Sequence, residues 1–501
     1  MSEFLIANMA PIIFASMVVF LLVGFPVSFA LAANGIFFGL IGIELGLLGP
    51  QLFQALPDRI FGIMSNDTLL AIPFFTFMGL ILERSGMAED LLDTIGQLFG
   101  PLRGGLAFAV ILVGALLAAT TGVVAASVIS MGLISLPIML RYGYDKKLAS
   151  GVIAASGTLA QIIPPSLVLI IMADQLGKSV GDMYAGAFVP GLTLTLFYVG
   201  YVVLVAIFRP RWVPALPSEA RTLRGAKLLL RVLTTLVPPL MLIFLVLGTI
   251  FLGIATPTEG GAMGATGALI MALVRRRLSW GLLKQAMETT AKLTTFVVFI
   301  LVGARVFSLT FYGVDGHKWV EHLLTGLPGG EIGFLIVVNV LVFLLAFFLD
   351  FFELSFIVVP LLGPVAQALG IDLIWFGVLL AVNMQTSFMH PPFGFALFYL
   401  RSVAPASVKS TDIYWGAIPF VCIQIIMVGI LIFFPQLVTL GLDKEEKVDL
   451  DAVKIEMPTS DYGTPTAPSS ADLQDKPTGS PEGTDDAGKA VLEALKRDSG
   501  K

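Results

Sequence analysis

Long uncharged apolar runs, separated by short polar segments, dominate the chain. Ten of these runs approach the ~20 residues that an α-helix needs to cross a bilayer. They lie at residues 4–23, 26–43, 68–83, 147–172, 185–208, 232–252, 258–274, 290–311, 373–400 and 414–436. The pattern predicts an all-α polytopic membrane protein with about ten transmembrane helices. The first run is expected to remain as a span, because no basic segment of the kind that opens a signal peptide precedes it.

A longer stretch at 105–140 does not fit a simple span. It has no charged residue over 36 positions and is flanked by Arg103 and Arg141. This length is too great for one crossing and rather short for two. We therefore predict a re-entrant hairpin, in which two half-helices meet within the membrane and return. Its midpoint is the small polar segment 120–122.

A second stretch, at 332–371, has a similar length and a similar midpoint. Its flanks are Glu331 and Asp372, acidic where the first stretch has arginines, and its midpoint is the segment Asp350-Phe-Phe-Glu353. The opposite flanking charge indicates a second re-entrant hairpin that enters from the opposite face.

The basic residues gather in four loops, around 141–147, 209–231, 275–284 and 401–409. Short loops rich in Lys and Arg stay on the cytoplasmic side. Threading ten spans through these loops places the N-terminus outside the cytoplasm, and the C-terminal segment with it.

Composition separates a membrane part from a solvated tail. Residues 443–501 carry 14 acidic and 8 basic side chains, whereas the preceding 442 residues carry only 21 and 22. That charge density is far below the quarter of residues usual in soluble domains. It excludes a soluble enzyme, a nucleic-acid-binding protein and a disordered scaffold. The segment 443–501 is predicted to be a disordered acidic tail, and the single Cys422 excludes an intramolecular disulfide and a cysteine-based metal site.

The two hairpin regions align with each other at an offset of 227 residues. Six of 29 ungapped positions are identical, among them Pro137 with Pro364 and the pair 164–165 with the pair 391–392. Four of the six are Pro or Gly, which set backbone shape. The alternative is coincidence between two proline-rich loops.

This repeat predicts the domain organisation. The first copy is 1–210, a basic cytoplasmic connector follows at 211–231, and the second copy is 232–440. Each copy holds five full spans, and an odd number gives the copies inverted topology, as in many secondary transporters.

In each copy the hairpin is followed by a helix that a Pro-Pro pair interrupts, at about 147–172 and 373–400. A helical proline cannot donate to the carbonyl four residues earlier, so the pairs free the carbonyls of Ala160, Gln161, Ser387 and Phe388. Free carbonyls within a membrane are costly unless they bind something, and hard cations prefer oxygen ligands. Two symmetric Na⁺ sites are predicted, and the half-helix N-termini beside them would attract an anion. The alternative is a pair of packed proline kinks.

Few charged residues lie within the apolar regions. Asp350 and Glu353 are either functional carboxylates or, for Glu353, a cap on a half-helix. The backbone of His390 is assigned to the second cation site and its ring to a structural role. Glu259 follows Pro257 at an expected helix start, where a carboxylate favours the positive helix end.

Four motifs resemble the large membrane subunit of the tripartite ATP-independent periplasmic (TRAP) transporters. They are Ala255-Thr-Pro-Thr-Glu259, Ile72-Pro-Phe-Phe-Thr-Phe-Met-Gly79, Ile163-Pro-Pro-Ser166 and Pro391-Pro-Phe-Gly394. The resemblance implies an ion-transporter-like elevator fold and a Na⁺-driven importer of a small organic carboxylate. It also implies a bacterial inner-membrane location, a small four-helix membrane subunit and a soluble periplasmic binding protein as partners. No cofactor is implied beyond Na⁺ as coupling ion, and no enzymatic activity.

The resemblance also implies site residues. The family's first Na⁺ site maps onto Thr121, Gly122, Ala160, Ile163 and Pro165. Its second maps onto Ala346, Asp350, Ser387, His390 and Phe393. The polar residues beside the tips and breaks form the expected substrate region: Thr120, Thr158, Gln161, Ser166, Gln385 and Thr386. The chain departs from many members at four positions. It has Thr121 and Val123 where they have Ser, Ala346 where they have Gly, and His390 where they have Thr.

Three other functions compete with this one. A stand-alone Na⁺/anion symporter with similar hairpins would transport without a binding protein. An intramembrane hydrolase would use Asp350 with Glu353, or a serine with His390, but paired aspartates on facing helices are missing. A passive channel fits poorly, because two hairpins would occlude it.

Overall fold

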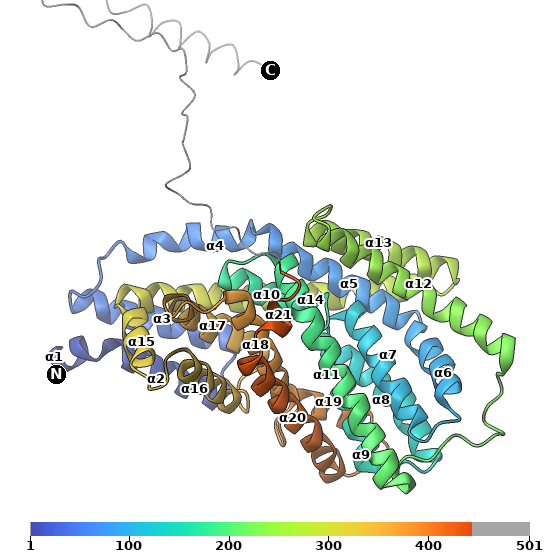
Figure 1. The fold of residues 1–501 in the computed structure, drawn as a ribbon. Coiled ribbons are helices and arrows are strands. Elements are labelled where there is room, and N and C mark those ends of the chain that lie inside the picture. Colours follow the sequence, from blue (N-terminus) through green and yellow to red (C-terminus); the bar gives the residue numbers. More distant parts are fainter. Residues whose placement is uncertain (1, 443–501) are drawn as a thin grey trace, which may run out of the picture. The chain divides into compact units, whose positions relative to one another are not determined.

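A computed structural model describes residues 2–442 of the chain. Residue 1 and residues 443–501 lie outside the described part, and the predicted acidic tail lies there too. Within residues 2–442 every regular element is a helix (Figure 1). Seven helices are long and apolar enough to cross a bilayer, or up to nine if two bent pairs each form one span. This confirms the polytopic helical class, while the number of ten crossings stays a prediction, because several predicted runs consist of two shorter helices.

The N-terminal elements contain two helices that the apolar runs do not predict, α4 and α6. They are missed because α4 is short and α6 is amphipathic, with Glu89 and Asp90 in its first turn. The elements are α1 (Ser2–Ala7), α2 (Met9–Val23), α3 (Val27–Glu44), η1 (Leu52–Ala55), α4 (Leu56–Met64), η2 (Asp67–Leu70), α5 (Ala71–Arg84) and α6 (Met87–Phe99).

Two helices, α7 and α8, occupy the region of the first predicted hairpin, and an interrupted helix follows them. The elements are α7 (Gly105–Thr121), α8 (Val124–Arg141), α9 (Lys146–Thr158), η3 (Leu159–Gln161), α10 (Leu167–Leu176), α11 (Val180–Phe208) and η4 (Pro210–Trp212). Asp145 begins α9 by accepting hydrogen bonds from the backbone N–H groups of Lys147 and Leu148.

Of the next four helices, the first and third extend beyond the predicted apolar runs, the second matches its run, and the fourth lies in no predicted run. They are α12 (Gly225–Phe251), α13 (Pro257–Val274), α14 (Trp280–Gly313) and α15 (Gly316–Thr325). A capping box between Thr256 and Glu259 begins α13, as the Pro-Thr-Glu motif predicts. The additional turns at the start of α12 and α14 carry charged residues, which an apolar-run criterion leaves out.

The last part repeats the order of a helix pair followed by an interrupted helix. Its elements are α16 (Gly330–Leu345), α17 (Phe351–Ala368), α18 (Leu373–Met384), η5 (Gln385–Phe388), α19 (Phe395–Val403), α20 (Ser410–Phe433) and α21 (Gln436–Thr439). Asp372 caps α18 as Asp145 caps α9. The two caps are 227 positions apart, which is the offset of the internal repeat.

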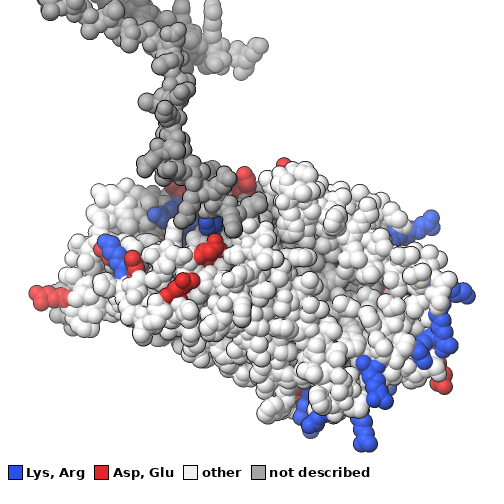
Figure 2. Space-filling model, in the orientation of Figure 1, with Lys and Arg blue, Asp and Glu red and all other residues white. Residues whose placement is uncertain are grey.

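Two basic loops meet at one acidic side chain. Arg231, Arg275 and Arg277 each lie 3.4–3.5 Å from the carboxylate of Asp90 on α6. The cluster therefore joins α6 to the ends of α12 and α13. Figure 2 shows blue side chains gathered at the lower right edge of the membrane part, while the middle of this face is almost free of charge.

The two halves of the chain pack into each other through small residues. Helix α20 lies against α9, and α17 and α18 lie against α10. A Cβ atom added at Gly151 of α9 would overlap with the Gly416 carbonyl of α20, and one added at Gly416 would overlap with the Lys147 carbonyl. Such close backbone approach is typical of membrane helix pairs.

We expect Gly416→Leu to destabilise the protein by about 1–3 kcal/mol, because its side chain must separate two backbones. Thermal unfolding of the purified chain measures this as a lower transition temperature. Gly429→Leu on the same helix is the control, since a Cβ atom at Gly429 meets nothing within 4 Å. Equal transition temperatures for the two variants would contradict the packing described here.

Candidate functional site

The tip of the first helix pair lies against the first break. Helix α7 ends at Gly122, whose φ of 58° is the left-handed conformation that glycine adopts without strain. A Cβ atom added at Gly122 would lie 3.4 Å from the Pro165 carbonyl oxygen and 3.3 Å from Cγ of Leu167. The structure thus brings together Gly122 and Pro165, two of the residues expected in the first Na⁺ site. The side chains of Thr120 and Thr121 lie outside the described part.

The first break is a turn between η3 and α10. Ser166 begins α10 by accepting a hydrogen bond from the N–H of Val168 at 3.2 Å, and its hydroxyl donates to the carbonyl of Gln161. The proline pair therefore does not leave the Gln161 carbonyl without a donor. Ala160 is fully buried beside it, and Ile163 is half-buried.

The second tip carries a carboxylate pair that caps a helix. Asp350 accepts a hydrogen bond from the N–H of Glu353 at 2.9 Å, and Glu353 accepts one from the N–H of Asp350 at 3.0 Å. This reciprocal capping box begins α17. The geometry matches the interpretation of Glu353 as a cap, and it holds both carboxylates at the tip.

The second break lies against the second tip through aromatic contacts. The ring of His390 stacks on Phe347 with centroids 4.1 Å apart and meets Phe343 edge-on at 4.4 Å. The ring centroids of Phe348 and the half-exposed Phe393 lie 6.2 Å apart. The backbone of His390 is used locally as well, because its carbonyl accepts the N–H of Gly394 at 2.6 Å. The His390 ring thus packs against the aromatic side chains of the second tip.

A cavity of about 370 Å³ lies where both tips and both breaks meet. The first tip contributes Gly122 to Ala125, and the second contributes Asp350 to Glu353. The remaining walls come from the two breaks and α14; they are Gln161, Leu167, Val168, Phe388, Phe395, Tyr399, Leu293 and Phe296. The volume lies within the range of small-molecule sites.

Four helices begin at this cavity. Their first residues, Val124 of α8, Leu167 of α10, Phe351 of α17 and Phe395 of α19, all line it. Helix N-termini carry partial positive charge and unpaired N–H groups. Side chains cap α10 and α17, whereas α8 and α19 have no side-chain cap. The cavity therefore offers N–H groups to an anion.

The lining contains no Lys, Arg or His side chain among the described residues, although it contains two carboxylates. Its other walls are mainly aromatic. Sequence reasoning missed Phe296, Phe352, Phe395 and Tyr399, because aromatic residues in apolar helices are equally typical of lipid-facing and core positions.

Four residues of the expected substrate region do not line the cavity. Thr158, Ser166, Gln385 and Thr386 are buried behind it. Gln385 donates to the hydroxyl of Thr158 at 3.1 Å, joining positions 227 apart and hence the two breaks. Of that expected region, Gln161 reaches the cavity.

Several buried oxygen atoms near the breaks have no hydrogen-bond donor in the described part of the chain. They are Oε1 of Gln161, Oε1 of Gln385 and Oγ of Ser387. Buried oxygens without a partner are rare in folded proteins. A hard cation is the kind of ligand that satisfies them.

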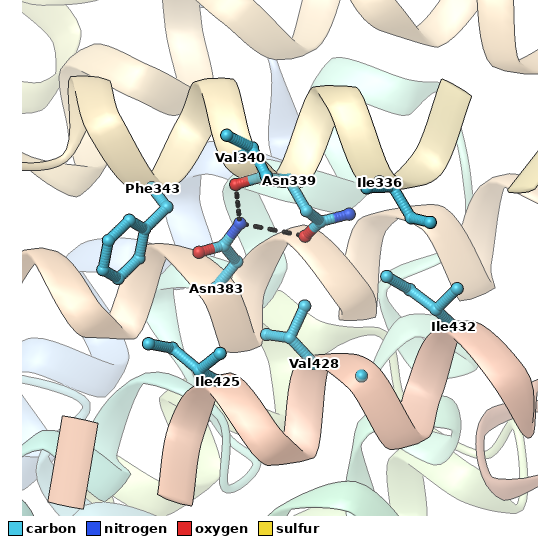
Figure 3. Close-up of a pocket in the computed structure, with 9 residues that line it drawn as sticks. Ile336, Asn339, Val340, Phe343, Asn383, Ile425, Val428 and Ile432 are labelled. Carbon is cyan, nitrogen blue, oxygen red and sulfur yellow. Dashed lines mark hydrogen bonds between the residues drawn. The ribbon is translucent and has the colours of Figure 1, made fainter. Parts of the chain in front are cut away.

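A separate pocket of about 290 Å³ lies between α16, α18 and α20 (Figure 3). Its walls are apolar except for Asn339 and Asn383. The amide of Asn383 donates to the carbonyl of Asn339 at 2.7 Å and to its side-chain oxygen at 2.9 Å. These hydrogen bonds join α16 of the second helix pair to α18 of the second interrupted helix. No charged residue lines this pocket among the described residues.

Comparison with known proteins decides the family. Residues 14–437 match the model of the tripartite ATP-independent periplasmic transporter, DctM component. This chain belongs to that family. Its members include a C4-dicarboxylate TRAP transporter large permease of Pseudomonas aeruginosa, 31% identical over 79% of this chain and 91% of that protein. An ectoine/5-hydroxyectoine TRAP transporter large permease of Ruegeria pomeroyi is 28% identical over 86% of this chain and 97% of that protein.

The fold is similar to a solved transporter. The YdaH transporter of Alcanivorax borkumensis has a TM-score of 0.55 over 77% of this chain and 88% of that chain, at 16% identity. The resemblance found in the sequence motifs is thus confirmed: the chain is a TRAP large permease, a multi-pass membrane protein and not an enzyme. Large permeases of this family work with a small membrane subunit and a periplasmic binding protein.

Proposed function

We propose that this TRAP permease imports a small organic carboxylate across the bacterial inner membrane in symport with Na⁺. The convergence of four helix N-termini on one cavity carries the proposal. Two of those N-termini, at Val124 and Phe395, lack side-chain caps. A bound carboxylate would accept hydrogen bonds there and would meet the positive ends of the helix dipoles.

Na⁺ would bind in the two contacts between tip and break. In the first, Gly122 lies against the Pro165 carbonyl. In the second, the uncoordinated Ser387 hydroxyl lies beside the His390 break. Because the cavity has carboxylates and no cationic side chain, bound Na⁺ would also supply the positive charge that an anionic substrate needs.

Transport would follow an elevator mechanism. The two helix pairs and the two interrupted helices, which enclose the cavity, would move together. Helices α3, α5, α13 and α14, which pack against one another, would stay in place with the small subunit. The substrate would then cross inside the cavity, as in other carriers with a binding site near the membrane centre.

Uptake into proteoliposomes tests the tripartite assignment. The chain is reconstituted with its cognate small subunit, with or without the cognate binding protein, under an inward Na⁺ gradient. We expect the binding protein to increase uptake of a radiolabelled carboxylate that it binds by about tenfold or more, a difference of ~1.4 kcal/mol. Equal uptake without the binding protein would instead support a stand-alone symporter.

A further inference from the structure

Two arginines line a crevice that is separate from the central cavity. Two adjoining hollows of about 240 and 310 Å³ share Arg59 of α4 with Leu301 and Arg305 of α14. None of their lining residues lines the central cavity. Arg305 lies within a helix long and apolar enough to span the membrane, where charged residues are costly and are commonly functional.

The larger hollow is positively charged. Both arginines line it together with Gln175, Ser308 and Tyr312, and no carboxylate is among its described lining residues. Neither arginine forms an ion pair or hydrogen bond within residues 2–442. Both side chains are exposed, and an anion bound between two like charges that share a hollow removes their mutual repulsion.

The acidic side chain that lines the smaller hollow already has hydrogen-bond partners. Asp174 lines the smaller hollow, but its oxygens accept the amides of Asn66 at 2.6 Å and of Gln175 at 2.7 Å. It lies beyond ion-pair distance of both arginines. The Tyr312 hydroxyl is also bound, because it donates to the carbonyl of Pro360 at 3.1 Å. Of the polar groups that line the larger hollow, the two arginines therefore remain for a ligand that carries negative charge and accepts hydrogen bonds.

Three helices connect this crevice with the central cavity. Helix α10 lines the cavity with Leu167 and the crevice with Asp174, which are ~10 Å apart along the axis at 1.5 Å per residue. On α14, Phe296 lines the cavity and Arg305 the crevice, separated by ~14 Å. Helix α17 likewise lines the cavity with Glu353 and the crevice with Pro360.

The crevice lies toward the far end of α14 from the basic loops. Helix α14 begins at Trp280, next to the cluster of Arg275 and Arg277, and ends at Gly313 near Arg305. In the proposed orientation this end faces the periplasm, where substrate arrives.

We infer that Arg59 and Arg305 form an outer binding site for a small organic carboxylate, which holds the anion before it enters the central cavity. The walls of the larger hollow come from α4 and α14 on one side and from α10 and α17 on the other. The site is therefore complete only while these two groups of helices keep their present arrangement. That the anion moves from this site into the central cavity rests on the proposed import function. The binding of an anion at Arg59 and Arg305 does not rest on it.

Arginine modification tests the binding site directly. The full chain in lipid nanodiscs, in Na⁺-free choline buffer, is treated with phenylglyoxal, and adducts at each arginine are quantified by mass spectrometry. We expect succinate to slow modification of Arg59 and Arg305 by about fivefold, a coupling of ~1 kcal/mol. Neutral succinamide should not protect them, and exposed Arg211, in the connector at the opposite end, should react equally in all samples.

Lack of protection by succinate, or equal protection of Arg211, would overturn the inference. Protection by an added binding protein but not by succinate would also overturn it, because the crevice would then be a protein-docking surface. Because the buffer contains no Na⁺, a failure of Na⁺-driven uptake leaves this result unaffected, and the two proposals can fail separately.

Transport kinetics provide the second measurement. In the assembled system, Arg59→Gln and Arg305→Gln should raise KM for uptake by about fivefold with kcat unchanged, since they weaken capture and not translocation. Arg211→Gln is the matched control and should leave both values unchanged. A fall in kcat with unchanged KM in the two variants would assign the arginines to translocation and contradict an outer binding site.

Discussion

Replacing Na⁺ by choline is expected to reduce uptake by the assembled transporter by about 100-fold, which corresponds to a coupling of ~2.7 kcal/mol. The physical reason lies in the cavity, whose described lining has two carboxylates and no cationic side chain. Without Na⁺, a bound carboxylate would be stabilised by helix N-termini alone against the charge of Asp350 and Glu353. Initial rates of uptake into proteoliposomes, at matched ionic strength, measure the effect.

Potassium and lithium salts serve as controls, because they preserve ionic strength and differ from Na⁺ in radius. Uptake in choline equal to uptake in Na⁺ would show that the tip–break contacts do not bind a coupling ion. The orphan oxygens of Gln161, Gln385 and Ser387 would then need another explanation.

We expect Gly122→Val to reduce uptake by about tenfold or more, because displacements of ~1 Å at a functional site have effects of that order. Gly122 holds a φ of 58°, where a β-branched residue is strongly disfavoured. Its side chain would also press on the Pro165 carbonyl and on Leu167, both 3.3–3.4 Å from the position of the first added carbon. Na⁺-dependent uptake by the purified variant measures the loss.

Gly177→Val is the matched control for this experiment. Gly177 ends α10 with a φ of 63°, but a Cβ atom there meets nothing within 4 Å. The Gly177→Val variant should therefore have a similar cost of ~1–2 kcal/mol for placing a side chain on a left-handed backbone. Unlike Gly122, Gly177 does not line the central cavity. If both variants lose uptake and thermal stability equally, the effect of Gly122→Val comes from backbone strain and not from the site.

The positions of the tips and breaks could be predicted from the sequence. Charged flanks bounded the stretch 105–140, and α7 and α8 begin and end within one residue of it. The proline pairs located both breaks, because proline removes a helical hydrogen bond wherever the chain later packs. The sequence left two roles open for Glu353, and the structure shows the cap on α17.

The lining of the cavity could not be predicted in this way. Thr158 and Gln385 were expected near substrate because they are polar and close to the breaks, yet they bond to each other behind the cavity. Tyr399 and Phe296 reach it from helices whose faces look alike in the sequence. Polarity indicates that a side chain needs a partner, but which partner it finds depends on the neighbouring helix.

The sequence by itself determined the membrane class, the two helix pairs, the breaks and the family, since apolar run length, proline and local capping act over a few residues. That these pairs are re-entrant stays a prediction, because α8 and α17 are long and apolar enough to cross a membrane. Only the tertiary structure decided that four helix N-termini meet at one cavity and that Arg59 lies near Arg305. These two arginines are 246 positions apart in the chain, and nothing local relates them. Their proximity results from helix packing, which depends on side-chain contacts between segments that the sequence does not order in space.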